Sequence, residues 1–204
     1  MRSSPSCFSL CLAVFGGITF TVLAAGSPPL TQSRPSYTEQ GLLEFPRRFR
    51  SWVFVGADLS VRYKSEEEKA STESDDSRNQ PPDAFHVVYI NPESYQAYLK
   101  TGQFPDPTIL VMEVFQAEEK QKGGIIAGGK YQGKRIELAA AVKDSHRPGG
   151  GVPWAYYTFE LDQKSGPVKP AKAFPDAQCY DCHRKHARKD NVWVQFYPAL
   201  RDPG

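Results

Sequence analysis

The chain has 204 residues, of which 40% are hydrophobic and 12% aromatic, and its formal net charge at pH 7 is +2. These values indicate a globular protein long enough for one domain with a sizeable core. The weak net charge, together with the absence of a glycine-rich phosphate loop or an internal repeat, gives no reason to expect a nucleic-acid partner.

Residues 1–25 read as a secretory signal peptide. A basic residue precedes an apolar run, and the small residues Ala24 and Ala25 suit cleavage by signal peptidase. The apolar run is short for a membrane span and is interrupted by glycines, which favours cleavage over anchoring. We therefore predict export, either to the periplasm or out of the cell. Cys7 and Cys11 would be removed with the signal.

Composition then divides the exported chain into a leader and one domain. Residues 26–44 predict a flexible leader, since most of this segment is rich in serine, proline and glutamine. Residues 45–204 predict the folded domain. Within it, residues 64–83 hold many acidic residues and serines and almost no apolar side chain, which is typical of a long solvated loop. Residues 50–57 are rich in aromatic and apolar side chains and fit either a helix end or a first strand.

A strand followed by a short helix comes next. Residues 84–90 are β-branched and aromatic, which predicts a strand with His86 and Val88 on the same face. Asn91 is followed by a proline and starts the predicted helix as its N-cap. The helix is expected to end near Gly102.

Three further strands are predicted. Residues 108–115 are rich in β-branched side chains. Residues 154–161 predict the last strand, with successive side chains on alternating faces. Residues 135–143 contain alanines that also suit a helix, but flanking glycines and the alternation favour a strand. The side chains expected to point inward from this strand are Ile136, Leu138, Ala140 and Val142.

The chain ends in predicted helices. Asp176 is expected to cap a helix that carries residues 179–183, and residues 190–201 are expected to form a final helix. This order of elements favours an α+β, mainly β fold. We expect an antiparallel sheet with a short helix between strands and, at the C-terminal end, helices that carry residues 179–183.

Cys179-Tyr-Asp-Cys182-His183 is the attachment signature of c-type haem. Its spacing lets two thiols reach two vinyl groups of one porphyrin, while the histidine donates a ring nitrogen to the iron. A Cys-x-x-Cys pair also occurs in zinc sites, redox dithiols and disulfides. A zinc site would need a crowded arrangement with His186, and no βαβ pattern suits a redox dithiol. We therefore predict covalently attached haem c, held by both cysteines, with His183 as iron ligand.

Further segments carry a resemblance to one family. They are Phe85–Pro92, Phe104–Glu113, Ala140–Ser145, Trp154–Phe159, Cys179–His183 and Phe196–Arg201. Together they resemble the cytochrome P-460 family, whose fold group includes cytochrome c′-beta, and the similarity extends roughly from Phe45 to Arg201. The resemblance implies a mainly antiparallel β fold, commonly a homodimer, with a haem whose distal side is open to a small ligand.

The same resemblance implies two kinds of activity. In the family's enzymes a lysine is cross-linked to the haem and hydroxylamine is oxidised, with nitric oxide involved in turnover. In c′-beta members the cross-link is missing, and an apolar distal pocket binds nitric oxide or carbon monoxide. The resemblance places Met112 at the position of the cross-linking lysine and His86 near the distal basic residue. It places the proton-accepting carboxylate within the Ala139–Ala141 segment, with Ala140 as part of the distal wall.

Several functions are compatible with these residues. The first is a gas-binding cytochrome with a five-coordinate haem. The second is an enzyme that oxidises hydroxylamine or nitric oxide through a lysine such as Lys100. The third is an electron carrier with Met112 or His86 as sixth ligand, and a peroxidase-like activity with His86 as proton acceptor is a fourth. A core role for Met112 and a hydrogen-bonded core or rim role for His86 are the structural alternatives. A redox partner protein is compatible with each function.

Overall fold

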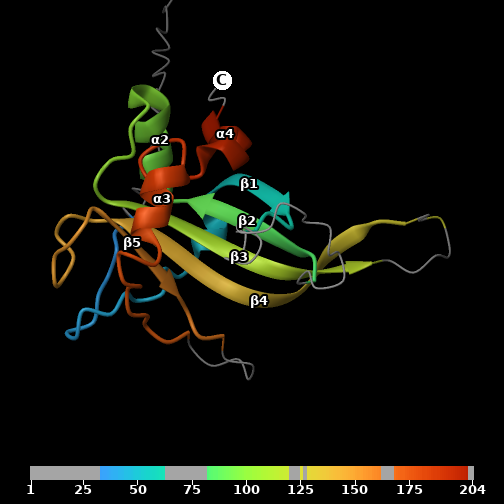
Figure 1. Ribbon diagram of the computed structural model, residues 1–204, viewed down its shortest axis with the longest axis horizontal. Coiled ribbons are helices and arrows are strands. Elements are labelled where there is room, and N and C mark those ends of the chain that lie inside the picture. Colours follow the sequence, from blue (N-terminus) through green and yellow to red (C-terminus); the bar gives the residue numbers. More distant parts are fainter. Residues whose placement is uncertain (1–32, 63–81, 120–124, 126–127, 162–167, 202–204) are drawn as a thin grey trace, which may run out of the picture. The chain divides into compact units, whose positions relative to one another are not determined.

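In the computed structural model, the described residues are 33–62, 82–119, 125, 128–161 and 168–201. They form a five-stranded antiparallel sheet in which each strand pairs with the next one along the chain (Figure 1). The strands are β1 (Val53–Leu59), β2 (Ala84–Ile90), β3 (Thr108–Glu119), β4 (Lys130–Lys143) and β5 (Trp154–Thr158). The α+β, mainly β architecture is confirmed. The predicted signal peptide and most of the predicted 64–83 loop lie outside the described residues.

The helices are few and short. They are α2 (Pro92–Thr101), α3 (Tyr180–His186) and α4 (Pro198–Arg201), with the 3-10 helices η1 (Phe49–Ser51) and η3 (Val194–Phe196). Within the described part of the chain, no helix has the length and apolar character needed to span a membrane.

The β2–α2 unit forms as the sequence predicts. Asn91 is the N-cap of α2, and the helix ends at Gly102, whose φ of 66° is the left-handed conformation that glycine adopts easily. The Asn91 side chain does not cap the helix. Its Oδ1 instead accepts the backbone N–H of Ile109 at 2.8 Å, and this contact ties the start of α2 to β3.

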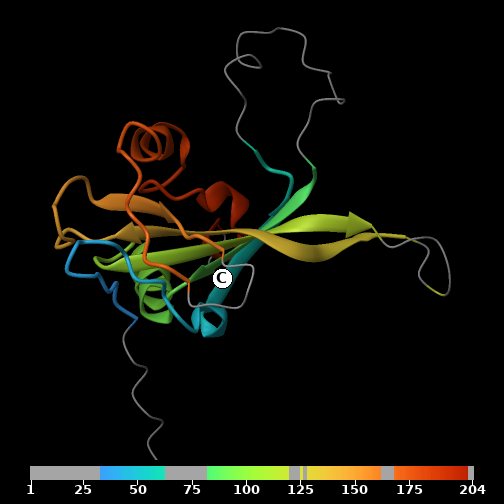
Figure 2. The ribbon, with the colours of Figure 1, turned by 90° about the horizontal axis from the view of Figure 1, so that it is seen from below.

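Both faces of the sheet are covered, because successive side chains of each strand point to opposite sides. On the face covered by the N-terminal segment, which we call the N-terminal face, the buried cluster consists of Leu43, Phe49, Ile109, Val111, Leu138, Ala140, Val142, Ala155, Tyr157, Phe159 and Ala171. On the opposite face, which the C-terminal residues cover and which we call the C-terminal face, the buried cluster consists of Val55, Val88, Ile90, Tyr98, Phe104, Leu110, Trp154, Tyr156, Val192, Val194 and Leu200. Figure 2 shows α3 and α4 on one side of the sheet and η1 on the other.

Part of the predicted leader belongs to the folded domain. Within residues 26–44, the described residues from 33 onward pack on the N-terminal face of the sheet. Leu43 is 1% exposed and exchanges two backbone hydrogen bonds with Ala171. The serine-, proline- and glutamine-rich composition of this segment predicts flexibility, but its few apolar side chains pack on the sheet.

The expectation that Ile136 points inward is wrong. Leu138, the next inward position, is fully buried, but Ile136 is 50% exposed. Val114 pairs with Glu137, and the next residue of β3 pairs with Arg135, so Ile136 is the extra residue of a β-bulge. A bulge interrupts the alternation of faces, which is why the pattern fails at this residue.

Two expected helices differ from the prediction. α3 has Cys179 as its N-cap, not Asp176, whose backbone carbonyl accepts the N–H of Asp181. Residues 190–201 do not form one helix, because Pro198 lacks a backbone N–H and disfavours the helical conformation at the residue before it. Tyr197 is accordingly extended, with φ −112° and ψ 96°, and separates η3 from α4.

A buried carboxylate ties η1 to the centre of the sheet. Glu113 of β3 is 1% exposed. It accepts hydrogen bonds from Nε and Nη2 of Arg50 at 3.0 and 2.7 Å, and from Nη1 of Arg135 at 2.7 Å. Two guanidinium groups thus compensate one buried charge, which would otherwise be strongly destabilising.

We predict that removing both arginines destabilises the protein more than removing the carboxylate. The double variant Arg50→Met with Arg135→Met leaves a buried charge without a cation and is expected to lose about 3–5 kcal/mol in urea unfolding. Glu113→Gln leaves guanidinium groups that reach solvent, so its expected loss is about 1.5–3 kcal/mol. A larger loss in Glu113→Gln than in the double variant would contradict this account.

Candidate haem site

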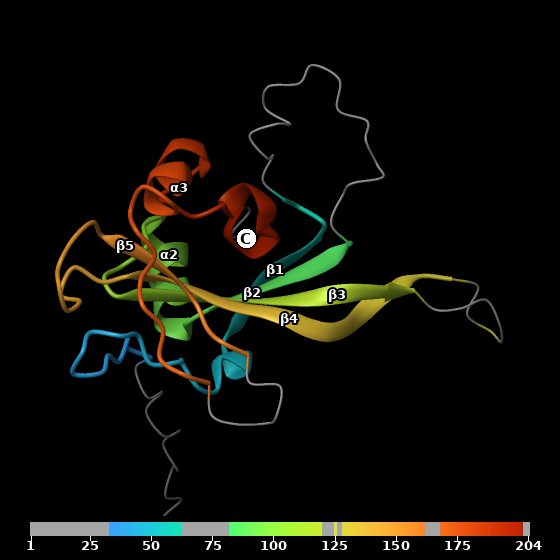
Figure 3. The same cartoon turned by 60° about the horizontal axis from the view of Figure 1, so that its bottom comes forward.

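The haem motif lies on the C-terminal face, where α3 runs beside β5 (Figure 3). Cys179 and Tyr180 pack against the cluster of that face. Cys179, Cys182 and His183 are all half-buried, and both thiols are free. The motif therefore lies at the border between the apolar core and solvent, where one flat prosthetic group can contact both thiols and the sheet.

The loop after α3 is fixed to the sheet by Asp190. Its carboxylate accepts hydrogen bonds from Trp154 Nε1 at 3.0 Å and from Lys143 Nζ at 2.8 Å. Asp190 and Asn191 both have positive φ values, 44° and 61°, which short polar side chains tolerate better than most. This turn brings the backbone carbonyl of Asn191 back towards α3.

The His183 ring is oriented by that carbonyl. Nδ1 lies 2.9 Å from the Asn191 oxygen, so the Nδ1 proton is donated there and Nε2 keeps its lone pair. The Tyr156 hydroxyl donates to the same oxygen at 3.1 Å, and the Tyr156 ring lies 4.2 Å from the imidazole between ring centroids. Burial lowers the pKa of His183, which favours the neutral ring. A neutral imidazole with an anchored Nδ1–H suits an iron ligand.

Trp193 contacts the nitrogen that would bind iron. Its indole Nε1 donates a hydrogen bond to His183 Nε2 at 3.2 Å, and its ring makes an edge contact with the imidazole. A metal would need the same lone pair, so iron coordination requires Trp193 to release this hydrogen bond. Two free thiols and an oriented imidazole otherwise fit the donor set of haem c.

The central strands present a half-exposed apolar strip beside the motif. We call it the haem strip and define it as Met112, Ala139 and Ala141. Met112 lies opposite Ala139 in the β3–β4 register, and both alanines are half-buried. Met112 and Ala141 pack against the same cluster as Cys179. Apolar side chains that are only partly covered, on the sheet face against which Cys179 packs, suit one face of a porphyrin.

Ala140 does not lie on this strip, contrary to expectation. It is 4% exposed and belongs to the cluster of the N-terminal face. The sheet therefore lies between Ala140 and the motif, because neighbouring residues of a strand point to opposite faces. Ala139 and Ala141 are the alanines on the side of Met112.

His86 lies on the C-terminal face and has an acidic partner. Its Nδ1 is 2.7 Å from Oδ1 of Asp58, and the two residues are direct cross-strand neighbours of β2 and β1. Their side chains are 20% and 17% exposed. His86 pairs with Val114 on its other side, so it lies in the row next to the one that contains Met112.

Glu137 is a polar residue of this face that the sequence interpretation missed. It is half-buried, lies opposite Val114, and its Oε1 accepts a hydrogen bond from the Thr158 hydroxyl at 3.3 Å. Two strand spacings, about 10 Å, separate its backbone from that of His86. The alternation that places Leu138 on the N-terminal face also places Glu137 on the opposite one, so the pattern contained the signal.

Comparison with known proteins identifies a related family. A family model described as Cytochrome P460 matches residues 46–194, more than two thirds of the chain. The matched range contains every strand of the sheet and the whole haem motif. No curated protein matches the chain.

We predict slow alkylation of Cys179 in the haem-free protein. Burial and the neighbouring Cys182 raise the pKa of the Cys179 thiol, so less of it is thiolate at a given pH. Iodoacetamide at pH 7.5 should modify Cys179 more slowly than the same cysteine in an unfolded peptide of residues 176–186. Mass spectrometry of the labelled peptides would measure both rates. Equal rates in the folded protein and the peptide would show that Cys179 is not protected.

Proposed function

The chain belongs to the cytochrome P460 family and is a haem-binding cytochrome, and we propose that it is an exported monohaem c-type cytochrome that binds nitric oxide or a similar small ligand. In this proposal Cys179 and Cys182 form thioethers with the haem, and His183 supplies Nε2 to the iron. The bound haem supplies an iron with one position open to a diatomic ligand, together with its redox chemistry.

The observation that carries the proposal is the apolar, lysine-free character of the haem strip. Strands β1, β2, β3 and β5 contain no lysine. Lys143, at the end of β4, donates to the Phe104 carbonyl and the Asp190 carboxylate, both at 2.8 Å. Lys100 is exposed on α2. The other lysines of β4, Lys130 and Lys134, are exposed, and Lys130 pairs with Asp83. A lysine cross-link is therefore not supported at the haem strip, whereas an apolar surface suits the binding of an uncharged gas.

Each part of the site has a distinct task in this proposal. Met112 and the two alanines of the haem strip exclude water and leave space beside small side chains. The Asn191 carbonyl holds the Nδ1 proton of His183, which fixes the ring and strengthens Nε2 as a donor. The His86–Asp58 pair lies in the next row and can accept or donate a proton at the edge of the strip.

Oxidation of hydroxylamine is the second candidate, and Glu137 is the observation that favours it. A half-buried carboxylate on the same face as Met112 can accept protons that such an oxidation releases. The intact mass of the holoprotein distinguishes the candidates, because a lysine–haem bond would lower the mass below that of the chain plus haem.

Export and assembly are further parts of the proposal. Cleavage after residue 25 would deliver the chain to the periplasm or the exterior, where c-type haem is attached. The family resemblance supports a homodimer, and redox turnover would need a partner protein that supplies or removes electrons.

We predict that the ferrous holoprotein is high-spin and five-coordinate and changes its visible spectrum on addition of nitric oxide. His183→Ala should lose the iron–histidine bond while both thioethers still form, because the thiols do not depend on the imidazole. His186→Ala, which changes an exposed histidine of the same helix, is the control and should keep the wild-type spectrum. A low-spin ferrous spectrum that does not respond to nitric oxide would refute the proposal.

We further predict that Met112→Ala leaves the number of iron ligands unchanged. The substitution enlarges the space above the haem strip and admits water, so the rate of nitric oxide dissociation should change while the ferrous spin state does not. Val111→Ala, which alters the opposite face, should lower stability without affecting that rate. If the unaltered ferrous protein is instead low-spin and Met112→Ala abolishes that low-spin spectrum, Met112 is a sixth ligand and the protein is an electron carrier.

A further inference from the structure

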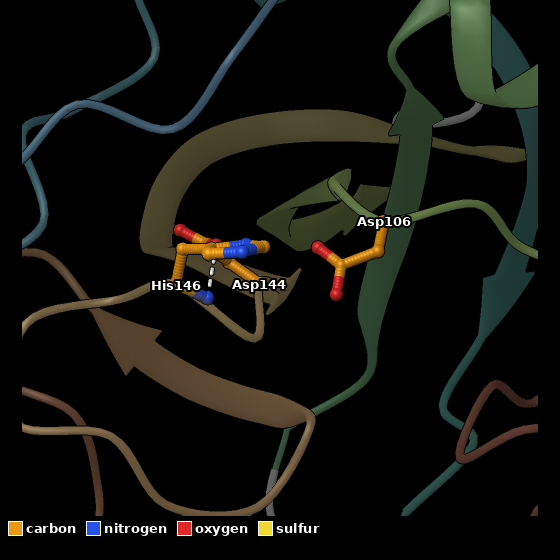
Figure 4. Close-up of side chains that lie close together, drawn as sticks. All are labelled: Asp106, Asp144 and His146. Carbon is orange, nitrogen blue, oxygen red and sulfur yellow. Dashed lines mark hydrogen bonds between the residues drawn. The ribbon is translucent and has the colours of Figure 1, made fainter.

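Polar side chains also converge where the turn before β3 meets the loop between β4 and β5. Asp106 comes from the turn, and Asp144 and His146 come from the loop (Figure 4). One ligand atom from each residue, a carboxylate oxygen or an imidazole nitrogen, lies within 4.8 Å of the other two. None of the three residues belongs to the haem motif or to the haem strip.

The two carboxylates have little compensation for their charge. Asp144 is 9% exposed, its Oδ1 accepts the backbone N–H of His146 at 2.9 Å, and its other neighbour in the core is the uncharged Tyr37 hydroxyl. Asp106 accepts the backbone N–H of Ser145 at 3.0 Å. Among the described residues, no lysine or arginine forms an ion pair with either carboxylate. A buried carboxylate without a cation is destabilising, and a bound metal ion would remove that cost.

Arg147 is close in sequence but is used elsewhere. It is 9% exposed, and its guanidinium donates to the backbone carbonyls of Val152 and Pro153. These bonds hold the shape of the β4–β5 loop. The arginine therefore shapes the loop that presents Asp144 and His146 without pairing with the carboxylate.

A separate observation comes from Tyr37, which approaches the same place from the N-terminal segment. Its hydroxyl oxygen is buried and makes no hydrogen bond of normal geometry. Burial, the charges of Tyr157 and Asp144, and hydrogen bonding to both residues raise the pKa of this hydroxyl, so it lies beside the buried carboxylate. Tyr37 therefore places a further oxygen next to Asp144, where it can contact water bound to an ion.

The donor set indicates the kind of ion. Two carboxylate oxygens with one imidazole nitrogen suit a divalent transition metal, whereas Ca²⁺ and Mg²⁺ prefer oxygen ligands throughout. Zinc binds such donors at about 2.0–2.2 Å, which places tetrahedral ligands about 3.5 Å from one another. Asp106 and His146 are exposed and can rotate to close the remaining gap. The Ser145 hydroxyl lies 3.1 Å from His146 Nδ1, a contact of the kind that orients metal-binding imidazoles.

We propose that Asp106, Asp144 and His146 bind one divalent transition-metal ion of the Zn²⁺ type, with water completing its coordination. The ion would join the turn before β3 to the loop after β4. These two strands carry the haem strip, so the ion would also hold one end of the haem-binding sheet together.

Calorimetric titration of the tag-free holoprotein with ZnCl₂ tests this site, with MgCl₂ and CaCl₂ as comparison ions. We expect one Zn²⁺ per chain and no comparable response to Mg²⁺ or Ca²⁺. Asp106→Asn and His146→Gln should each weaken Zn²⁺ binding at least about tenfold. Both changes are at exposed positions, and an unaltered haem spectrum would show that the variants are folded.

His186→Gln is the matched control, because it removes an exposed histidine outside the proposed site. It should bind Zn²⁺ like the unaltered protein, and Zn²⁺ should raise the Tm of both but not of the Asp106 and His146 variants. Absence of saturable Zn²⁺ binding, or binding that persists in both variants, would overturn the proposal. Loss of Zn²⁺ binding in His186→Gln would also overturn the proposal.

Discussion

The register between β3 and β4 is the constraint on which the rest of the structure depends. Met112 lies opposite Ala139, and Val111 lies opposite Ala140. A shift of one residue would exchange the faces of one strand relative to the other. In the observed register, Val111 and Ala140 lie in the core of the N-terminal face, while Met112 and Ala139 lie on the C-terminal face. One pair of strands thus builds the core on one side and the proposed haem wall on the other.

His183, the proposed iron ligand, is positioned by contacts that converge on one short loop. Asp190 ties the loop to Trp154 and Lys143, and the carbonyl of the next residue accepts protons from His183 and Tyr156. The motif helix has no buried residue of its own. Its placement therefore comes from the sheet and from this loop, which explains how seven helical residues can present a ligand in a defined orientation.

Local composition is sufficient to predict β2 and α2, whereas the segment that forms β1 fits either a helix end or a strand. The β-branched and aromatic content of residues 84–90 predicts β2 to its end residues, and the Asn91-Pro92 pair predicts the start of α2. The family resemblance places Ala140 on the distal wall, but the sheet buries both of its faces and Ala140 lies on the N-terminal one. The partners of His86 and His183 could not be predicted, because Asp58 and Asn191 carry no pattern that marks them. The failure at Ile136 has the same origin, since only the pairing of two strands reveals a bulge.

In the proposed holoprotein, the haem lies against the C-terminal face of the sheet. Paramagnetic broadening of methyl NMR signals in the ferric holoprotein tests it most directly, because the effect falls steeply with distance from the iron. We expect the methyl signals of Met112, Ala139 and Ala141 to broaden strongly and those of Val111 and Ala140 to broaden far less. Stronger broadening of Val111 and Ala140 than of Met112 and Ala141 would contradict it.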